Sequence, residues 1–522
     1  MAMRWVVALA ALLFLSAGAM AAGGPVVSTG EGRLEGVARG DVRAFLGIPF
    51  AAPPVGDKRW RAPQPVRRWR GVRAATAFGP ACWQAVTPEG FGPWSREYVV
   101  QGEVSEDCLT LNVWAPAAAS RRPRPVMVWI HGGGFNSGSG AIPIYHGEAL
   151  AKRGIVAVTI NYRVNVFGFL AHPELSKEAG AAPPTNFGLQ DMIAALRWVR
   201  ENIGAFGGDP RAVTIAGQSA GAMAVHDLIA SPMARGLFHR AIAQSGLPPL
   251  RPLPGLGHAE REGLAFAAEK GASSLAALRA LPAEALQPKN GSNTGRFMPV
   301  VDGALLPLSP LDALRSGRAA DVPVLAGFTA DEASAASDYG SDDPALLEEL
   351  LRDNFGPAVE RVAALYPRAT AAERAHSIME MHRDRWRGTF YLWAKDRNAR
   401  GTVPLYAYLF SRVAPGPQSA RWRAFHSSEI PYVFGTLDAA PERGFTAAER
   451  AFSEQIADYW VNFVRTGSPN GPGLPEWPTF TGEQPLVMEL GETAAARPLL
   501  APEKLRWLQG QLERQRSGKP SP

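Results

Sequence analysis

After its N-terminus the sequence lacks any apolar run long enough to span a bilayer, which takes roughly 20 residues. The one candidate, residues 5–15, is shorter, follows Arg4 and precedes the small-residue site at residues 19–21. This pattern is typical of a signal peptide over residues 1–22. We therefore expect a secreted or periplasmic protein, bacterial in origin, with no stable membrane insertion. An uncleaved anchor is the alternative.

Cysteine is also scarce, because Cys82 and Cys108 are the only two in 522 residues. Two thiols are too few for a cysteine-based metal site. In an exported protein an isolated pair usually forms a disulfide. The bond would close a loop of about 25 residues and stabilise the fold by roughly 3 kcal/mol. Two free thiols are the alternative.

The sequence lacks the signatures of nucleic-acid-binding proteins. Its net charge is +6, and arginines cluster at residues 67–73 and 121–124 among prolines typical of loops. It has no zinc-finger spacing, no aromatic RNA-binding motif and no continuous basic helix. We interpret the arginines as a solvated basic surface and expect no nucleic-acid partner.

The rest of the composition is that of a globular protein, with 46% hydrophobic and 20% charged residues. Apolar runs recur along the whole length, and no repeat or low-complexity linker marks a boundary. The sequence therefore predicts a single domain over residues 23–508. The polar stretch 509–522 is predicted to be a disordered tail.

Three short apolar runs predict strands buried on both faces of a sheet, at residues 126–130, 155–160 and 213–216. Residues 189–203 have the spacing of an amphipathic helix. Strand, helix and strand in this order favour an α/β fold with a largely parallel sheet. Further strands are predicted at residues 322–328 and 403–409, and mostly helical insertions at residues 264–286 and 344–400.

The sharpest chemical motif is Gly217-Gln218-Ser219-Ala220-Gly221, which fits G-x-S-x-G. It lies between the predicted strand at residues 213–216 and a helix-compatible run at residues 220–230. A sharp strand-to-helix turn exposes a serine at the end of the sheet and needs small neighbours. The motif predicts that Ser219 is the nucleophile of an α/β-hydrolase. A structural turn serine is the alternative.

A second motif, His131-Gly132-Gly133-Gly134-Phe135, directly follows the predicted strand at residues 126–130. Its glycines let the backbone approach a substrate closely. We expect the N–H groups of Gly133, Gly134 and Ala220 to form an oxyanion hole, where one such bond is worth about 3 kcal/mol. A flexible turn is the alternative.

A serine nucleophile needs a base and an acid that orients it. In this fold the chain order is Ser, acid, His. The candidates that remain are His239, His258, His376, His382 and His426. Position alone does not select among them, although His426 stands out in a loop ahead of a proline-containing segment.

Several longer stretches of the sequence match those of one enzyme family. They are Phe206-Gly207-Gly208-Asp209-Pro210 ahead of the serine motif, residues 106–113, residues 45–56 and residues 459–470. On these motifs the chain resembles the type-B carboxylesterases, which include bacterial esterases, mammalian carboxylesterases and cholinesterases. The resemblance covers residues 25–485. It implies a large, mostly parallel central sheet with helices on both faces and helical insertions over the active site.

The resemblance also implies roles for individual residues. Residues 327–332 resemble the family's G-x-T-x-D-E segment, which makes Glu332 the acid. Residues 425–435 resemble its F-H-x-x-E segment, which makes His426 the base. It further implies a disulfide between Cys82 and Cys108, and buried ion pairs between Arg59 and Glu106 and between Arg163 and Asp191.

The implied function is hydrolysis of small-molecule carboxylic esters by a Ser-His-Glu triad and an acyl-enzyme, without metal or cofactor. Many family members carry Glu where this chain has Gln218, which makes a cationic substrate less favourable here. Trp83, Trp94 or Tyr98 could still offer a π face to a cation. Ala333 replaces the glycine that usually follows the acid. We expect a neutral, moderately apolar ester.

Other functions stay open on the same sequence. A lipase, an amidase and a natural-product esterase would use the same triad. A lipase would also need an exposed apolar lid, which the sequence neither shows nor excludes. A non-catalytic binding protein would typically have lost a triad member, whereas this chain keeps all three.

Overall fold

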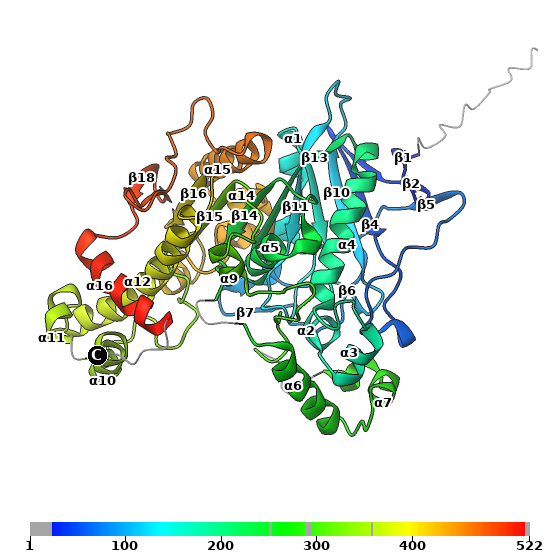
Figure 1. Ribbon diagram of the computed structural model, residues 1–522. Helices are drawn as coiled ribbons and strands as arrows, with labels where there is room; N and C mark the ends of the chain where they lie inside the picture. The colour runs from blue at the N-terminus through cyan, green and yellow to red at the C-terminus, as the bar shows by residue number, and fades with distance from the viewer. Residues whose placement is uncertain (1–22, 250–252, 288–294, 357–358, 517–522) are drawn as a thin grey trace, which may run out of the picture.

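The computed structural model describes residues 23–249, 253–287, 295–356 and 359–516 (Figure 1). The predicted signal peptide, residues 1–22, lies outside the described residues. At the other end, helix α16, Pro502–Arg516, continues past residue 509. The prediction of a disordered tail from residue 509 was therefore wrong for residues 509–516. Gln509 donates a hydrogen bond to Glu513 one turn later in this helix.

A sheet of 11 strands forms the centre of the fold, in the order β18-β17-β16-β15-β14-β13-β11-β12-β10-β4-β3. From β12 to β17 every neighbouring pair is parallel, and the pairs at both edges are antiparallel. The prediction of a mostly parallel sheet is confirmed. In chain order the strands are β3 Val37–Arg39, β4 Val42–Pro49, β10 Thr110–Pro116, β11 Arg124–Ile130, β12 Val156–Ile160, β13 Gly208–Gln218, β14 Arg240–Gln244, β15 Val324–Thr329, β16 Leu405–Phe410, β17 Leu486–Leu490 and β18 Ala494–Pro498.

The strands at the centre are apolar throughout because each face of the sheet is covered. In β11, Val128 and Ile130 pack into one core, whereas Met127 and Trp129 pack into the other. The first core includes residues of α4 Phe187–Asn202, α5 Ala220–Ala230 and α12 Ala371–Asn398. The second includes residues of α1 Glu148–Lys152, α14 Ile430–Phe434 and α15 Ala447–Thr466.

The two stretches predicted as helical insertions are helical, but each divides into several helices. They are α6 Leu256–Glu269, α7 Leu275–Ala280, α8 Ala283–Leu286, α10 Pro344–Phe355, α11 Val359–Val362 and α12. Thr370 and Glu373 form a reciprocal capping box at the start of α12, which fixes where that helix begins. Figure 1 shows α6 and α7 together beyond one end of the sheet, and α10 to α12 grouped with α16.

The cysteine loop is a separate small unit at the edge of the sheet. Cys82 and Cys108 are joined by a disulfide, as the sequence predicts. Inside the loop, β6 Ala81–Cys82 pairs with β9 Val104–Ser105, and β7 Gly90–Phe91 forms a hairpin with β8 Trp94–Ser95. The loop is thereby closed at its base and ordered at its tip.

Both predicted ion pairs are present. Arg59 Nε lies 2.7 Å from Glu106, and Arg163 Nη2 lies 2.7 Å from Asp191. Arg163 also donates through its backbone N–H to Asp191 at 3.0 Å. Such pairs fix geometry more than they add net stability. No helix in the described ranges has the length and apolarity needed to cross a bilayer.

Candidate active site

Ser219 lies in the sharp turn between β13 and α5. Its φ of 56° and ψ of −124° are strained for a residue with a side chain. Its backbone N–H donates to Gln244 O at 2.8 Å, which ties the turn to the neighbouring strand β14. A Cβ on Gly221 would lie 2.1 Å from Ile130 O, so only glycine fits there. This close packing holds the turn in its strained conformation and exposes the serine.

His426 and Glu332 form a hydrogen-bonded pair beside this turn. His426 Nδ1 bonds Glu332 Oε2, and Thr329 N–H donates to the other carboxylate oxygen at 2.8 Å. Burial alone would lower the pKa of the imidazole, but Glu332 and, more weakly, Glu429 raise that pKa above its ordinary value of 6.5. The carboxylate therefore stabilises the imidazolium and leaves Nε2 as the ring nitrogen with the basic lone pair.

Gln218, the residue before the serine, bonds this basic nitrogen. Gln218 Nε2 lies 3.0 Å from His426 Nε2 and donates to Ser427 Oγ at 2.9 Å. In this structure the imidazole therefore accepts from the Gln218 amide and not from Ser219. The amide is neutral, so it places no charge beside the base.

The glycine loop after β11 lies against Ser219. Gly133 and Gly134 have φ values of 107° and 63°, which favour glycine. Asn136 and Ser137 donate their N–H groups back to Gly133 O, closing a tight turn. A Cβ on Gly132 would lie 3.1 Å from Ser219 Cβ, so the loop touches the serine. Ala220 is the first residue of α5, and its N–H has no acceptor within the helix.

These groups open on one cavity of about 550 Å³. Its wall includes Ser219, His426, Gly133, Gly134 and the apolar or aromatic side chains Val86, Phe91, Trp94, Tyr98, Val100, Ile142 and Tyr145. No Asp, Glu, Lys or Arg is among the described residues that line it. Of the three aromatic residues singled out in the sequence, Trp94 and Tyr98 line the cavity and Trp83 does not.

The other candidate histidines lie elsewhere. Of the five candidates, only His426 is among the described residues that line this cavity. His382 bonds Asp338 at 3.2 Å, and His239 accepts from the N–H of Val213. His131, at the start of the glycine loop, is stacked on Tyr162, and burial lowers the pKa of its imidazole to about 4. The structure thus brings together the serine, histidine and glutamate that the resemblance implies.

Two polar residues of the site were not identified from the sequence. Ser427 accepts from Gln218, and its φ of 86° is unusual for a serine. Glu429 is fully buried, and Gln244 Nε2 donates to it at 3.0 Å. Burial raises the pKa of the Glu429 carboxyl to about 7. Glu429 is the glutamate of the F-H-x-x-E segment, and that motif was the only sequence signal that pointed to it.

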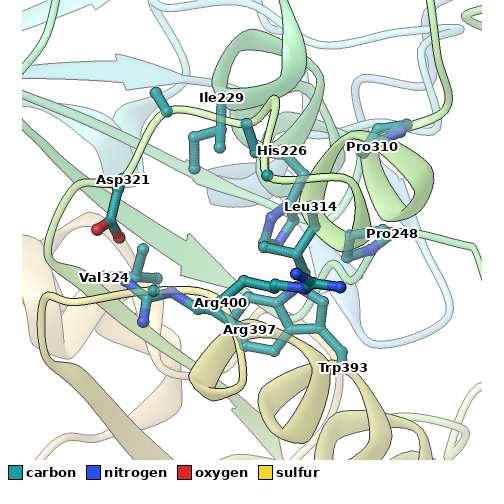
Figure 2. A pocket seen from close by; sticks show the side chains of 14 residues that line it. His226, Ile229, Pro248, Pro310, Leu314, Asp321, Val324, Trp393, Arg397 and Arg400 are labelled. Carbon is teal, nitrogen blue, oxygen red and sulfur yellow. The ribbon is translucent and has the colours of Figure 1, made fainter.

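A second cavity lies on the far side of α5, and Figure 2 shows His226 and Trp393 on its wall. It measures about 80 Å³, and its described wall contains neither serine nor cysteine. Burial lowers the pKa of the His226 imidazole to about 3. None of Ser219, Glu332 and His426 is among its described lining residues. Among the described residues no group of three His, Cys, Asp or Glu side chains is arranged to hold a metal ion.

Comparisons with known proteins identify the family of this chain. The model of the carboxylesterase family matches residues 23–507. Fumonisin B1 esterase of Sphingopyxis macrogoltabida is 38% identical over 470 residues, covering 87% of this chain and 84% of that protein. Para-nitrobenzyl esterase of Bacillus subtilis is 37% identical over 480 residues, covering 88% and 93%. A solved structure of PNB esterase has a TM-score of 0.77 at 33% identity, covering 92% of this chain and 99% of its own. The chain therefore belongs to the carboxylesterase family and is a serine hydrolase of carboxylic esters.

Proposed function

We propose that this enzyme hydrolyses neutral, moderately apolar esters through an acyl-enzyme on Ser219. The observation that carries the proposal is the His426–Glu332 pair at the edge of the cavity that Ser219 lines. His426 Nε2 removes the hydroxyl proton while Ser219 Oγ attacks the ester carbonyl carbon. The N–H groups of Gly133, Gly134 and Ala220 bind the oxyanion that forms.

The proton on His426 then completes the first half of the reaction. The tetrahedral intermediate collapses, its C–O bond to the alcohol breaks, and the alcohol leaves with that proton. A water molecule, deprotonated by His426, attacks the carbonyl carbon of the acyl-enzyme. The C–O bond to Ser219 Oγ then breaks, Ser219 takes the proton from His426, and the carboxylic acid is released. Glu332 keeps the imidazole of His426 oriented and stabilises the imidazolium in both halves of the reaction.

One hydrogen bond must be exchanged before attack. His426 Nε2 accepts from Gln218 in the free enzyme. Substrate seated on the glycine loop moves the Ser219 hydroxyl into place as the donor, and Gln218 keeps its bond to Ser427 Oγ at 2.9 Å. Catalytic hydrogen bonds commonly tighten only in the substrate complex.

The substrate class follows from the cavity wall. Its volume of about 550 Å³ suits an aromatic or similarly bulky ester group. An ammonium group would find aromatic faces there but no carboxylate on the described wall. Two relatives are named for the esters on which they act, as fumonisin B1 esterase and para-nitrobenzyl esterase, and the second name denotes an aromatic ester group. We therefore favour a neutral ester with a bulky group on the Trp94 side.

The test is hydrolysis of p-nitrophenyl acetate, butyrate and octanoate by the wild type and by Ser219→Ala. We expect turnover by the wild type and a loss of at least about 10⁴-fold in kcat in the variant. A fluorophosphonate should label the wild type at one site per chain and leave the variant unlabelled. Folded wild-type protein that neither turns over these esters nor reacts with the probe would overturn the proposal.

We also propose that the protein is exported. The support is the signal-peptide pattern in residues 1–22, together with a disulfide, which persists mainly in oxidising compartments. Expression in a bacterium followed by N-terminal sequencing of the periplasmic fraction tests this. We expect a mature chain that begins near residue 22. Full-length chain retained in the cytoplasm would contradict export.

A further inference from the structure

The hairpin β7–β8 of the cysteine loop reaches the catalytic histidine. Trp94 Nε1 donates to the backbone carbonyl of His426 at 3.1 Å and approaches Ser427 Oγ at 3.3 Å. The Trp94 ring meets the imidazole edge to face, with 6.3 Å between ring centroids. One side chain therefore contacts the base, its backbone and the residue that follows it.

The segment that carries this tryptophan is itself fixed. Arg443 donates to Ser95 Oγ at 2.7 Å, to Glu97 at 2.8 Å and to Pro93 O at 3.2 Å. Its guanidinium also lies 5.4 Å from the ring of Phe425, the residue before the base. Arg443 thus contacts both the hairpin, at the two residues that flank Trp94, and the histidine loop, at Phe425.

The histidine loop needs such support because its backbone is strained. Ser427 has a φ of 86°, a conformation that costs a side-chain-bearing residue about 1–3 kcal/mol. Its hydroxyl is approached by two donors, Gln218 and Trp94. Both donors therefore fix the loop that carries the imidazole at the wall of the cavity that Ser219 also lines.

We propose that Trp94 is a positioning residue: its indole N–H holds the loop of the catalytic base while its ring forms the substrate wall. The inference rests on the proposed function, since it assigns His426 as the base. It goes further by making the cysteine loop part of the catalytic machinery. A substrate group that packs against the Trp94 ring therefore contacts the same side chain that orients the imidazole.

The test compares Trp94→Phe with Phe91→Leu. Trp94→Phe keeps an aromatic wall and removes the N–H. Phe91 lines the same cavity, packs 5.1 Å from Trp94 and has no hydrogen bond to the histidine loop, so its variant is the matched control. Each enzyme is assayed on p-nitrophenyl butyrate and on the bulkier 1-naphthyl butyrate, with kcat and KM measured separately.

For Trp94→Phe we expect kcat to fall about tenfold on both esters, as the loss of one positioning hydrogen bond predicts, with KM little changed. The acid limb of kcat/KM should also move to lower pH, because a loosened imidazole contacts Glu332 less closely. Phe91→Leu, which alters the cavity wall and keeps the Trp94 N–H, should act mainly by raising KM for the naphthyl ester, and should lower kcat and move the acid limb less than Trp94→Phe does. The rate of fluorophosphonate labelling, which needs the same base, should fall in Trp94→Phe alone.

Trp94→Phe with wild-type kcat, pH profile and labelling rate would overturn the positioning role, whatever its effect on KM. That result is distinct from failure of the proposed function, in which the wild type itself shows neither turnover nor labelling.

Discussion

At the scale of single residues, position 218 sets the charge beside the imidazole of His426, the proposed base. A carboxylate in place of the Gln218 amide would lie about 3.0 Å from His426 Nε2. It would stabilise the imidazolium, and a protonated imidazole cannot act as a base. For Gln218→Glu we therefore expect the acid limb of kcat/KM to move up by about one pH unit. Neutral-ester turnover should fall about tenfold at pH 6 and little at pH 8.5.

The control for this prediction is Gln218→Met, which removes the amide and adds no charge, so that its acid limb should stay near that of the wild type. A second effect, on the binding of a cationic substrate, is measured by comparing KM for butyrylcholine with KM for its uncharged carbon analogue, 3,3-dimethylbutyl butyrate. The new carboxylate should lower KM for the choline ester relative to the analogue. An unmoved acid limb together with an unchanged KM ratio would show that position 218 does not act through charge.

Some residues of the site could be predicted from the sequence and others could not, and their separation along the chain explains the difference. Ser219 could be predicted because its strand, turn and helix are adjacent in the chain. His426 and Glu332 are 94 residues apart, and only the resemblance to a family selected them. The bond between Trp94 and His426 spans 332 residues and leaves no local pattern. Contacts of that kind depend on how loops meet, which periodicity does not encode.

At the scale of elements, strands and helices were predicted where one periodicity ran unbroken. The predicted strand at residues 126–130 lies within β11, and the predicted helix at residues 220–230 coincides with α5. The second long helical stretch, residues 344–400, is instead interrupted at Gly356, whose φ is 52°, and by Pro367. The helix beyond residue 509 was missed because its sequence is as polar as that of a disordered segment.

The cysteine loop is the element whose stability can be tested by itself. Replacing both Cys82 and Cys108 with alanine should lower the free energy of unfolding by about 3 kcal/mol, mainly because the unfolded chain gains freedom. In the folded state Arg443 and the β6–β9 pair still hold the loop. We therefore expect kcat at low temperature to stay close to that of the wild type. Urea unfolding with and without reductant measures the difference.

Reduced wild type serves as the control, since it should unfold at the same urea concentration as the double variant. A double variant as stable as the oxidised protein would mean that the bond adds nothing to folding. A variant that is stable but has lost turnover would mean that the disulfide, and not Arg443, positions the hairpin.

At the scale of the whole molecule, buried ionisable groups set how stability depends on pH. Burial raises the pKa of Asp227 to about 8 and that of Glu429 to about 7. The contribution of these two carboxyls to the free energy of unfolding is complete below their ordinary pKa values. It is lost as the pH rises through their raised pKa values in the folded protein. Burial lowers the pKa of His131 and His226 to about 4 and about 3, so their contribution is complete above 6.5 and is lost as pH falls.

Because the carboxyls and the two buried histidines change the free energy of unfolding in opposite directions as the pH rises, the effect of the carboxyls is dominant in only one pH range. Between pH 6.5 and pH 8 those histidines are neutral in the folded chain and lose only the remainder of their protons in the unfolded one, whereas Asp227 stays protonated in the folded chain and is ionised in the unfolded one. His426, whose pKa is raised, adds a loss of stability in the same direction. The melting temperature of the wild type should therefore fall between pH 6.5 and pH 8.5.

Asp227→Asn should remove much of that fall, because the amide fills the same space and never ionises. At pH 8.5 we expect the variant to exceed the wild type by on the order of 2 kcal/mol, and near pH 4 the two should unfold alike. Asp57→Asn removes the same charge from an exposed turn and should track the wild type at every pH. Melting curves across this range decide the matter. If those of Asp227→Asn run parallel to the wild type, the buried carboxyl is already ionised in the folded protein, and the alkaline loss of stability must come from Glu429 and His426.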